Sequence, residues 1–220
     1  MPATGPGLGL LGVERPVRYG ITDRRLCPSL GLRDYLDRLF RTSAHLIQWR
    51  EKDLDPQTNR RWLEIGRELA RRSGKKLLCN TDVEAALALG LDGVHLTSRQ
   101  DAVAVLGRLG PSRSLLVGQS VHSLDEALAA QEAGVDYLLA GPVFRPLSKA
   151  SAAPPLGLDG LARLAAAVVI PVIALGGVTP AHWPGLAALP NLAGFAGISW
   201  LAEEIQRSGE NLPSQGPPVP

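Results

Sequence analysis

Cationic side chains follow short apolar segments at two places in this 220-residue chain. Arg50 and Lys52 come directly after an apolar run that ends at Trp49, and Lys149 lies in a long loop after a later run. Guanidinium and ammonium groups make the charge-assisted hydrogen bonds that a phosphate or diphosphate group requires. Arg50-Glu51-Lys52 taken alone could equally be a solvated charge run at the start of a loop.

Two other apolar segments run directly into small residues. Residues 171–175 are followed by Gly176-Gly177, and residues 194–196 are followed by Gly197-Ile198-Ser199. In a (β/α)8 barrel, the loops after the last two strands and the start of a short helix commonly hold a phosphate with their backbone N–H groups. Glycines that only relieve crowding at strand ends are the alternative. Together with the three cations, these segments favour a site for a small phosphorylated ligand.

His122 is the residue best suited to acid–base chemistry, because only imidazole has an unperturbed pKa close to neutrality. It follows the apolar run 115–119 within the sequence Ser120-Val-His122. A histidine that only caps the next helix is the alternative. His95 alternates with apolar neighbours inside a short segment, so we expect it to be a hydrogen-bonded core residue.

The elements around these residues must bring them together. Short apolar segments alternate with amphipathic ones, which is the pattern of repeated strand–helix units and a parallel sheet. Eight strands and eight helices in alternation predict one compact α/β domain, a (β/α)8 TIM barrel with its chemistry at the carboxyl ends of the strands. No G-x-G-x-x-G follows the first strand, so a dinucleotide site is not expected. The expected strands are 17–22, 45–49, 76–79, 93–96, 115–119, 137–140, 171–175 and 194–196.

The barrel is expected to span residues 17–206, between tails 1–16 and 207–220 whose glycine and proline content predicts disorder. Cys27 and Cys79 are too few for a disulfide scaffold and lack metal-ligand spacing, which favours a reducing compartment. No charged leader precedes an apolar core, and the longest apolar run, 164–175, is too short to span a bilayer. A soluble, cytoplasmic protein is therefore expected.

The charge balance excludes some classes of partner. The 23 basic and 21 acidic residues are mixed along the chain and give a formal net charge of +2. Nucleic acids and anionic membranes attract blocks of Lys and Arg, and the sequence has none. We therefore expect neither a nucleic acid nor a membrane as partner. Barrels of this size often self-associate through their outer helices, so a homo-oligomer stays open.

Six motifs follow one another at the expected strand ends: Gln48-Trp-Arg-Glu-Lys52, Asp92-Gly-Val-His-Leu96, Ser120-Val-His-Ser123, Gly141-Pro-Val-Phe144, Pro155-Leu-Gly157 and Ile173-Ala-Leu-Gly-Gly-Val-Thr179. Together they make residues 17–206 resemble the thiamine phosphate synthase/TenI superfamily. The resemblance implies a (β/α)8 barrel that handles thiamine precursors. In the synthase branch, an aminopyrimidine carbinyl diphosphate loses pyrophosphate with the help of Mg²⁺. The nitrogen of a hydroxyethylthiazole phosphate then captures the resulting cation.

The resemblance also implies roles for single positions. Gly177, Ile198 and Ser199 match the cradle for the thiazole phosphate, and Ser148, next to Lys149, falls within the loop that closes over it. A small phosphorylated thiazole or thiamine phosphate is the ligand that these matches imply. The residues that match the pyrimidine–diphosphate positions are Gln48, Arg50, Lys52, Asn80, Ser120 and Lys149.

Both magnesium-ligand positions depart from the synthase pattern. In the synthase pattern that the chain resembles, N-D-R follows the third strand and G-Q-E-D follows the fourth, and the aspartate of each motif holds Mg²⁺. Here Thr81 and Gln100 stand in their places. Asp82 and Asp101 each lie one residue late, where a side chain usually turns to a different face. No metal is therefore expected, unless the chain is a synthase in which Asp82 and Asp101 restore a magnesium site.

The TenI-like branch resembles the chain because it also lacks the paired aspartates and keeps the Ser-Val-His-Ser run. We therefore expect the chain to lie closer to that branch. Its members act as thiazole tautomerases, which move a proton so that a carboxythiazole phosphate becomes aromatic without a metal. His122 would move the proton here, and the cradle with Lys149 would hold the phosphate. One alternative is a thiamine phosphate synthase, also called thiamine-phosphate diphosphorylase, with rearranged magnesium ligands. The other is a binding protein for thiamine precursors that catalyses nothing.

Overall fold

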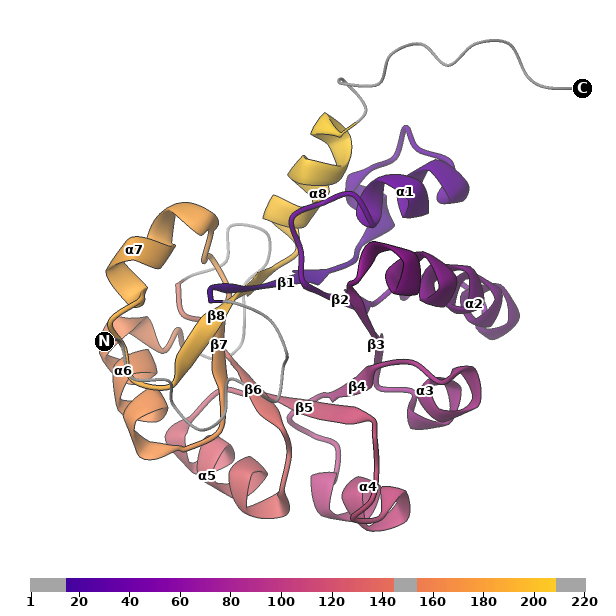
Figure 1. Ribbon diagram of the computed structural model, residues 1–220. Helices are drawn as coiled ribbons and strands as arrows, with labels where there is room; N and C mark the ends of the chain where they lie inside the picture. The colour runs from indigo at the N-terminus through magenta and orange to yellow at the C-terminus, as the bar shows by residue number, and fades with distance from the viewer. Residues whose placement is uncertain (1–14, 145–153, 209–220) are drawn as a thin grey trace, which may run out of the picture.

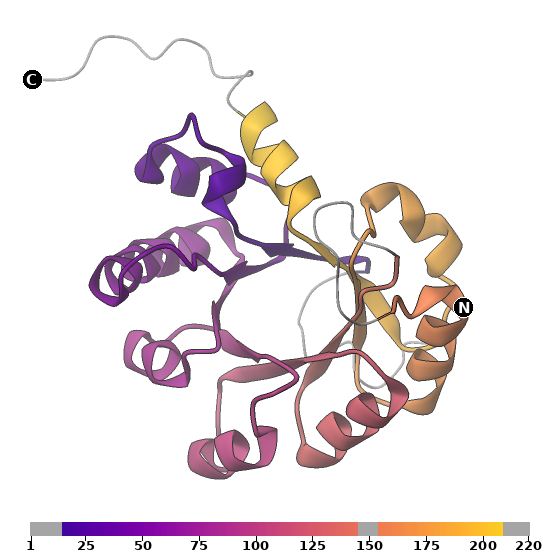
Figure 2. The same cartoon turned by 180° about the vertical axis from the view of Figure 1, so that it is seen from behind.

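Eight parallel strands close into a barrel, and the helices surround it (Figure 1, Figure 2). The computed structural model describes residues 15–144 and 154–208. Each strand pairs with the next one in the chain, and β8 returns to pair with β1. The expected TIM barrel is confirmed, and every strand end agrees with the expectation within two residues. The strands are β1 (Val17–Ile21), β2 (Leu46–Trp49), β3 (Lys76–Asn80), β4 (Gly93–Leu96), β5 (Leu116–Val121), β6 (Tyr137–Ala140), β7 (Val172–Leu175) and β8 (Leu192–Gly197).

Helices fill the connections between the strands, as the alternating pattern predicts. The segment after β7 differs from the other connections, because it starts with a 3-10 turn over Pro180–His182 and continues into the short helix α7. A second 3-10 turn, Arg24–Leu26, precedes α1. The α-helices are α1 (Leu32–Leu39), α2 (Pro56–Ser73), α3 (Val83–Leu89), α4 (Ala102–Leu109), α5 (Leu124–Ala133), α6 (Gly157–Ala167), α7 (Trp183–Leu186) and α8 (Ser199–Arg207).

Side chains on each strand alternate between two hydrophobic layers. Val17, Tyr19 and Ile21 of β1 point into the barrel and belong to its small interior cluster. Trp49 of β2 belongs to the larger layer between strands and helices, where its Nε1 donates to Asn59 Oδ1 of α2 at 2.7 Å. Trp49 therefore faces the helices and not the interior of the barrel.

A glycine makes room for an aromatic ring inside the barrel. A Cβ atom on Gly118 of β5 would lie 1.9 Å from Cζ of Tyr137 on β6, so a larger residue would displace the ring. Tyr137 and Tyr19 are both fully buried, and their ring centroids are 5.8 Å apart. The interior is thus filled partly by tyrosines, whose hydroxyl groups need hydrogen-bond partners there.

Polar caps set the starts of helices at the carboxyl ends of the strands. Ser123 Oγ accepts a hydrogen bond from the Glu126 backbone N–H at 3.1 Å and so caps α5. Gly90 and Gly134 end α3 and α5 in the left-handed conformation that favours glycine. The Ser123 cap thus fixes the loop from β5 to α5, and the two glycines end the helices before the chain turns back into β4 and β6.

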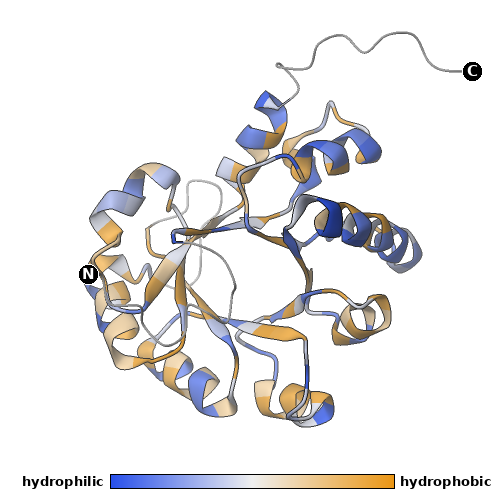
Figure 3. Cartoon of the chain, in the orientation of Figure 1, coloured by the Kyte–Doolittle hydropathy of each residue, from blue (hydrophilic) through white to orange (hydrophobic). Residues whose placement is uncertain are grey.

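The outer helices differ in hydropathy (Figure 3). α2 is largely hydrophilic, whereas α4 is largely hydrophobic and its Val103 side chain is 66% exposed. Among the helices that the structure describes, none is both long enough and apolar enough to cross a membrane. Cys27 and Cys79 are buried free thiols. The two expected tails lie mostly outside the described residues, so their disorder stays a prediction.

Candidate functional site

A network of hydrogen-bonded side chains lies inside the barrel near the carboxyl ends of the strands. Gln48 on β2 donates from Nε2 to Asn80 Oδ1 on β3 at 2.7 Å. Ser120 Oγ on β5 lies 2.9 Å from His95 Nε2 on β4. Gln48 and His95 are buried, and Asn80 and Ser120 are half-buried. Three of the expected site residues, Gln48, Asn80 and Ser120, therefore belong to one region of the barrel interior.

Two tyrosines connect these pairs. Tyr19 OH lies 3.2 Å from Gln48 Oε1 and 3.0 Å from Tyr137 OH. Tyr137 OH in turn lies 3.2 Å from His95 Nδ1. The expectation that His95 is a hydrogen-bonded core residue is confirmed. Burial lowers the pKa of His95 to about 3, so its ring is neutral at physiological pH.

Arg50, Glu51 and Lys52 continue β2 onto the rim of the barrel. The Arg50 backbone N–H donates to Thr22 Oγ1 at 2.8 Å, and Glu51 Oε2 accepts from the Arg24 backbone N–H at 2.9 Å. Glu51 is buried, Arg50 is half-buried and Lys52 is exposed. Burial raises the pKa of the Glu51 carboxyl group. These residues are therefore not a simple solvated charge run, because the acidic member is packed inside the protein.

His122 lies just beyond β5 on the same rim. Its Nδ1 contacts the Gly141 carbonyl oxygen, which follows β6. Because a carbonyl oxygen only accepts, Nδ1 carries a proton, and Nε2 of the neutral ring is the bare nitrogen. The His122 backbone N–H donates to the Glu126 carboxylate at 2.7 Å. Ser123 is the residue that caps α5, so the interpretation of His122 as a helix cap is wrong.

The glycine-rich ends of β7 and β8 lie on this rim as well. Gly176 and Gly177 adopt φ angles of 93° and 68°, and a Cβ atom on Gly177 would lie 2.8 Å from Phe144 Cβ. Both glycines are thus needed for the turn and for the close approach of the loop after β6, whether or not a phosphate binds there. Ile198 and Ser199 stand at the start of α8, where the first backbone N–H groups have no acceptor within the helix. Phosphate binding at these ends stays a prediction.

The structure does not describe all the expected site residues. Ser148 and Lys149 lie outside the described residues, so the structure does not place them. The remaining candidates all come from the ends of strands or from the residues directly after them. They are Gln48, Arg50, Lys52, Asn80, Ser120, His122, Gly177, Ile198 and Ser199.

An amide connects the two positions at which the synthase pattern has magnesium ligands. Gln100 Nε2 donates to the Thr81 carbonyl oxygen at 3.2 Å, and Gln100 Oε1 accepts from the Thr97 backbone N–H at 2.9 Å. Thr81 itself adopts a φ angle of 65°. The loops after β3 and β4 are thus held together by a neutral hydrogen bond.

The described residues do not fit Mg²⁺ at this place. Asp82 accepts a hydrogen bond from the Ala85 backbone N–H at 2.9 Å, and Asp101 accepts one from the Ala104 backbone N–H at 3.0 Å. Both carboxylates therefore cap helices, α3 and α4, through Oδ1, and a magnesium site that uses Asp82 and Asp101 stays a prediction of the synthase alternative. Within residues 15–144 and 154–208, no group of three His, Cys, Asp or Glu side chains could hold a metal ion.

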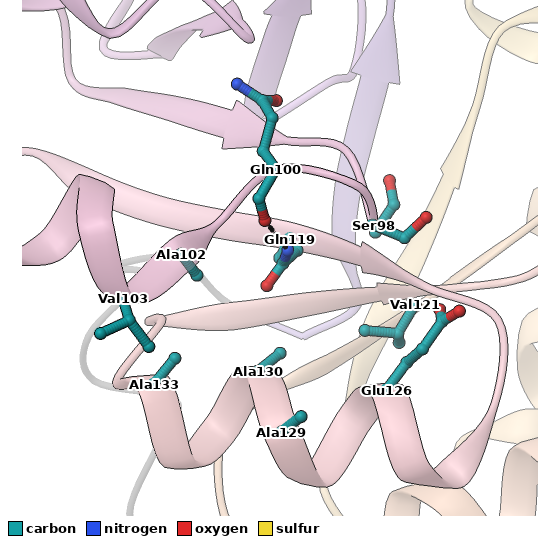
Figure 4. Close-up of a pocket in the computed structure, with 11 residues that line it drawn as sticks. Ser98, Gln100, Ala102, Val103, Gln119, Val121, Glu126, Ala129, Ala130 and Ala133 are labelled. Carbon is teal, nitrogen blue, oxygen red and sulfur yellow. Dashed lines mark hydrogen bonds between the residues drawn. The ribbon is translucent and has the colours of Figure 1, made fainter.

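A separate cavity of about 240 Å³ lies between α4 and α5, outside the strand β5 (Figure 4). Small side chains of α5, Ala129, Ala130 and Ala133, line one wall. On the strand side, Gln119 Nε2 donates to the carbonyl oxygens of Thr97 and Gln100 at 3.1 Å and 3.0 Å. Gln119 thereby fixes the loop after β4 from outside the barrel, and its neighbour Ser120, a member of the interior network, also lines the cavity.

The closed parallel barrel, with polar side chains gathered at the carboxyl ends of its strands, defines a TIM-barrel protein with its site in the usual place for that fold. Residues 18–201 match the thiamine monophosphate synthase family, TMP-TENI, and the chain belongs to this family. The family acts in thiamine biosynthesis and binds phosphorylated thiamine precursors.

Similar proteins carry the name of the synthase. The thiamine-phosphate synthase of Chloroflexus aurantiacus is 39% identical over 165 residues, which are 74% of this chain and 75% of that protein. The thiamine-phosphate synthase of a Roseiflexus species is 36% identical over 192 residues, 85% and 77% of the two chains. A solved structure of a thiamine phosphate pyrophosphorylase from Pyrococcus furiosus has a TM-score of 0.72 at 30% identity and covers 89% of this chain and 96% of its own. These comparisons favour the synthase and do not single out the TenI branch.

Sequence reasoning missed two members of the network, Tyr19 and Tyr137. Both sit among apolar residues of short strands, where a tyrosine is indistinguishable from a core residue. The signal that could have found them is the alternation along β1, which places Tyr19 on the same face as the interior residues Val17 and Ile21.

Proposed function

We propose that this chain is a thiazole tautomerase of thiamine biosynthesis, which binds a thiazole phosphate and moves a proton on it without a metal ion. The observation that carries this proposal is the hydrogen bond between Gln100 and Thr81. This hydrogen bond joins the two positions at which the synthase pattern has carboxylates, and both residues there have neutral side chains. Without Mg²⁺, ionising a diphosphate leaving group is much harder, whereas a proton transfer needs only an acid–base group.

His122 is the proton carrier in this proposal. Its Nδ1 is held by the Gly141 carbonyl oxygen, so Nε2 is free to take a proton from one atom of the substrate. The imidazolium that forms returns a proton to another atom, and the ring becomes aromatic with no net change in protons. The N–H groups at Gly177, Ile198 and Ser199 would hold the phosphate and keep the ring at the rim.

Thiamine-phosphate synthase is the second candidate, and the names of the relatives favour it. The contact between Gln48 and Asn80 also favours it, because both match pyrimidine–diphosphate positions. A synthase would have to hold Mg²⁺ through groups other than the side chains of Thr81 and Gln100. Formation of thiamine phosphate from the pyrimidine diphosphate and the thiazole phosphate, abolished by EDTA, would establish this second candidate.

Substitution of His122 tests the tautomerase directly. In His122→Ala we expect the catalysed conversion of carboxythiazole phosphate to fall by about 10²- to 10⁴-fold, which is the usual contribution of a general acid–base group. Binding of the phosphorylated product, measured by calorimetry, should stay within about twofold. The matched control is His45→Ala, because His45 directly precedes β2, at the opposite end of the barrel.

The outcomes separate the three functions. An unchanged rate in His122→Ala would remove His122 from the mechanism. Tight binding of thiazole phosphate by the native protein, with neither conversion nor thiamine phosphate formation, would identify a binding protein. Equal losses in His122→Ala and His45→Ala would show damage to folding and not a catalytic effect.

A further inference from the structure

The hydrogen bonds of the interior network have a direction that the chemistry of its members determines. An amide oxygen only accepts, so Tyr19 OH donates to Gln48 Oε1 at 3.2 Å. A hydroxyl group has a single proton, so the Tyr19 oxygen must accept from Tyr137 OH, 3.0 Å away. The Tyr137 proton is then used, and its oxygen must accept from His95 Nδ1 at 3.2 Å.

The hydrogen bonds at both ends of the network have the same direction. With its proton on Nδ1, the neutral His95 ring has a bare Nε2, which accepts from Ser120 Oγ at 2.9 Å. At the other end, Gln48 Nε2 donates to Asn80 Oδ1 at 2.7 Å. Every hydrogen bond therefore points the same way, from Ser120 on β5 to Asn80 on β3.

We propose that Tyr19, Tyr137 and His95 are positioning residues, whose one-way hydrogen bonds decide which groups the barrel rim offers to a ligand. Because the Ser120 proton is directed to His95, the Ser120 oxygen is presented as an acceptor. Because Asn80 Oδ1 is used by Gln48, the Asn80 side chain presents its N–H₂ group as a donor. The rim thus offers a ligand one acceptor, the Ser120 oxygen, and one donor, the Asn80 N–H₂ group.

The packing of the network keeps its members from changing partners. Tyr19 and Tyr137 are fully buried, and His95 is 3% exposed. The His95 and Tyr137 rings stack with centroids 5.8 Å apart, so the histidine cannot rotate without displacing the tyrosine. Turning over the Gln48 amide, together with that of Asn80, would reverse every bond in the network. The His95 tautomer therefore depends on the orientation of the Gln48 amide, which is three hydrogen bonds away.

The test is the tautomer of His95 in the full-length protein labelled with ¹⁵N at histidine. Ring nitrogen shifts and proton couplings distinguish the two neutral forms, and a His95→Asn variant assigns the signals. We expect a proton on Nδ1 and a bare Nε2, unchanged between pH 6 and 8. A proton on Nε2, or an equal mixture of both forms, would overturn the proposal.

Two substitutions of Gln48 separate a one-way network from local packing. Gln48→Glu keeps an oxygen that accepts from Tyr19, so the His95 tautomer should stay on Nδ1. Gln48→Met has a similar shape but no acceptor, which frees the Tyr19 proton, and we expect the His95 signals to become an average of both tautomers. A His95 tautomer unchanged in Gln48→Met would contradict the proposed control by Gln48.

Which ligand meets Ser120 and Asn80 rests on the proposed function, whereas the tautomer measurements need no substrate. The two can therefore fail separately. A protein that converts no thiazole phosphate but has His95 protonated on Nδ1 would keep the positioning role and lose the tautomerase. A catalytically active protein with His95 protonated on Nε2 would do the reverse.

Discussion

At the scale of single residues, an amide in place of a carboxylate changes what the ends of β3 and β4 can bind. A carboxylate repels a carbonyl oxygen and attracts a cation, whereas the Gln100 amide donates to the Thr81 carbonyl oxygen at 3.2 Å. Mg²⁺ requires near-octahedral oxygen ligands with negative charge among them, and neither residue supplies a charge. The exchange therefore turns a metal-binding position into a structural contact between two loops.

Thermal unfolding in Mg²⁺ tests this exchange. A ligand that binds only the folded protein stabilises it by RT ln(1 + [L]/Kd), or about 2.7 kcal/mol at one hundred times Kd. We expect the unfolding midpoint in 10 mM MgCl₂ to equal that in EDTA with matched ionic strength. A clear rise of the midpoint with Mg²⁺, absent with a monovalent salt at the same ionic strength, would show a magnesium site.

The buried carboxyl group of Glu51 should make the stability of the protein depend on pH. Burial raises the pKa of Glu51 in the folded protein, whereas in the unfolded chain a glutamate has a pKa of about 4.3. The folded state therefore holds the proton to higher pH, and the free energy of unfolding falls as pH rises from about 4.3 through the folded pKa. Each pH unit inside that window costs at most about 1.4 kcal/mol.

Glu51→Gln removes this dependence and keeps an oxygen that can accept from the Arg24 backbone N–H. Denaturant unfolding between pH 4 and 8 should show a smaller fall in stability for Glu51→Gln than for the native protein. The control is Glu132→Gln, an exposed glutamate of α5. Parallel pH curves for the native protein and Glu51→Gln would show that Glu51 does not cause the dependence.

At the scale of elements, the strands hold the network because their side chains alternate and their glycines leave space. Gly118 is the clearest case, since Tyr137 occupies the volume where its Cβ atom would lie. From that place the tyrosine hydroxyl contacts both Tyr19 and His95. The polar interior of the site thus depends on the absence of a side chain in the neighbouring strand.

Gly118→Ala should therefore destabilise the protein. The added Cβ atom would lie 1.9 Å from Tyr137 Cζ, and overpacking of this kind typically costs about 1–3 kcal/mol. The matched control is Gly107→Ala on α4, where an added Cβ atom meets nothing within 4 Å and should stabilise the helix by up to about 1 kcal/mol. Equal stabilities of the two variants in denaturant unfolding would contradict the tight contact.

At the scale of the whole molecule, the barrel places the ends of all eight strands on one rim. Strand order follows the chain, so residues that are far apart in sequence, such as Gln48 and Ser120, lie at the same end of the barrel. His122, for which we propose the role of proton carrier, and the glycine-rich ends of β7 and β8 lie at that end too.

Much of this arrangement could be predicted from the sequence. Runs such as residues 137–140 and 171–175 are buried on both faces, so composition alone identifies them as strands of a parallel sheet. Residues directly after such runs, including Arg50 and His122, must lie on the rim. β8 is longer than the expected 194–196, because it spans Leu192–Gly197 and Ala193 and Gly194 carry no strong strand preference.

The connections inside the barrel could not be predicted in this way. Alternation shows that Tyr19 points inward, but only the stagger between strands decides that it meets Gln48 and Tyr137. The same holds for Gln100, whose side chain reaches Thr81 across two loops. Such contacts depend on three-dimensional register and not on residue type.

The most direct test of the account is the rate of carboxythiazole phosphate isomerisation by the purified protein in EDTA and in Mg²⁺, followed by the change in ultraviolet absorption on aromatisation. We predict a catalysed rate that is the same in both and that is lost in His122→Ala. No catalysed isomerisation, together with magnesium-dependent formation of thiamine phosphate by the same preparation, would contradict the account and establish the protein as a synthase.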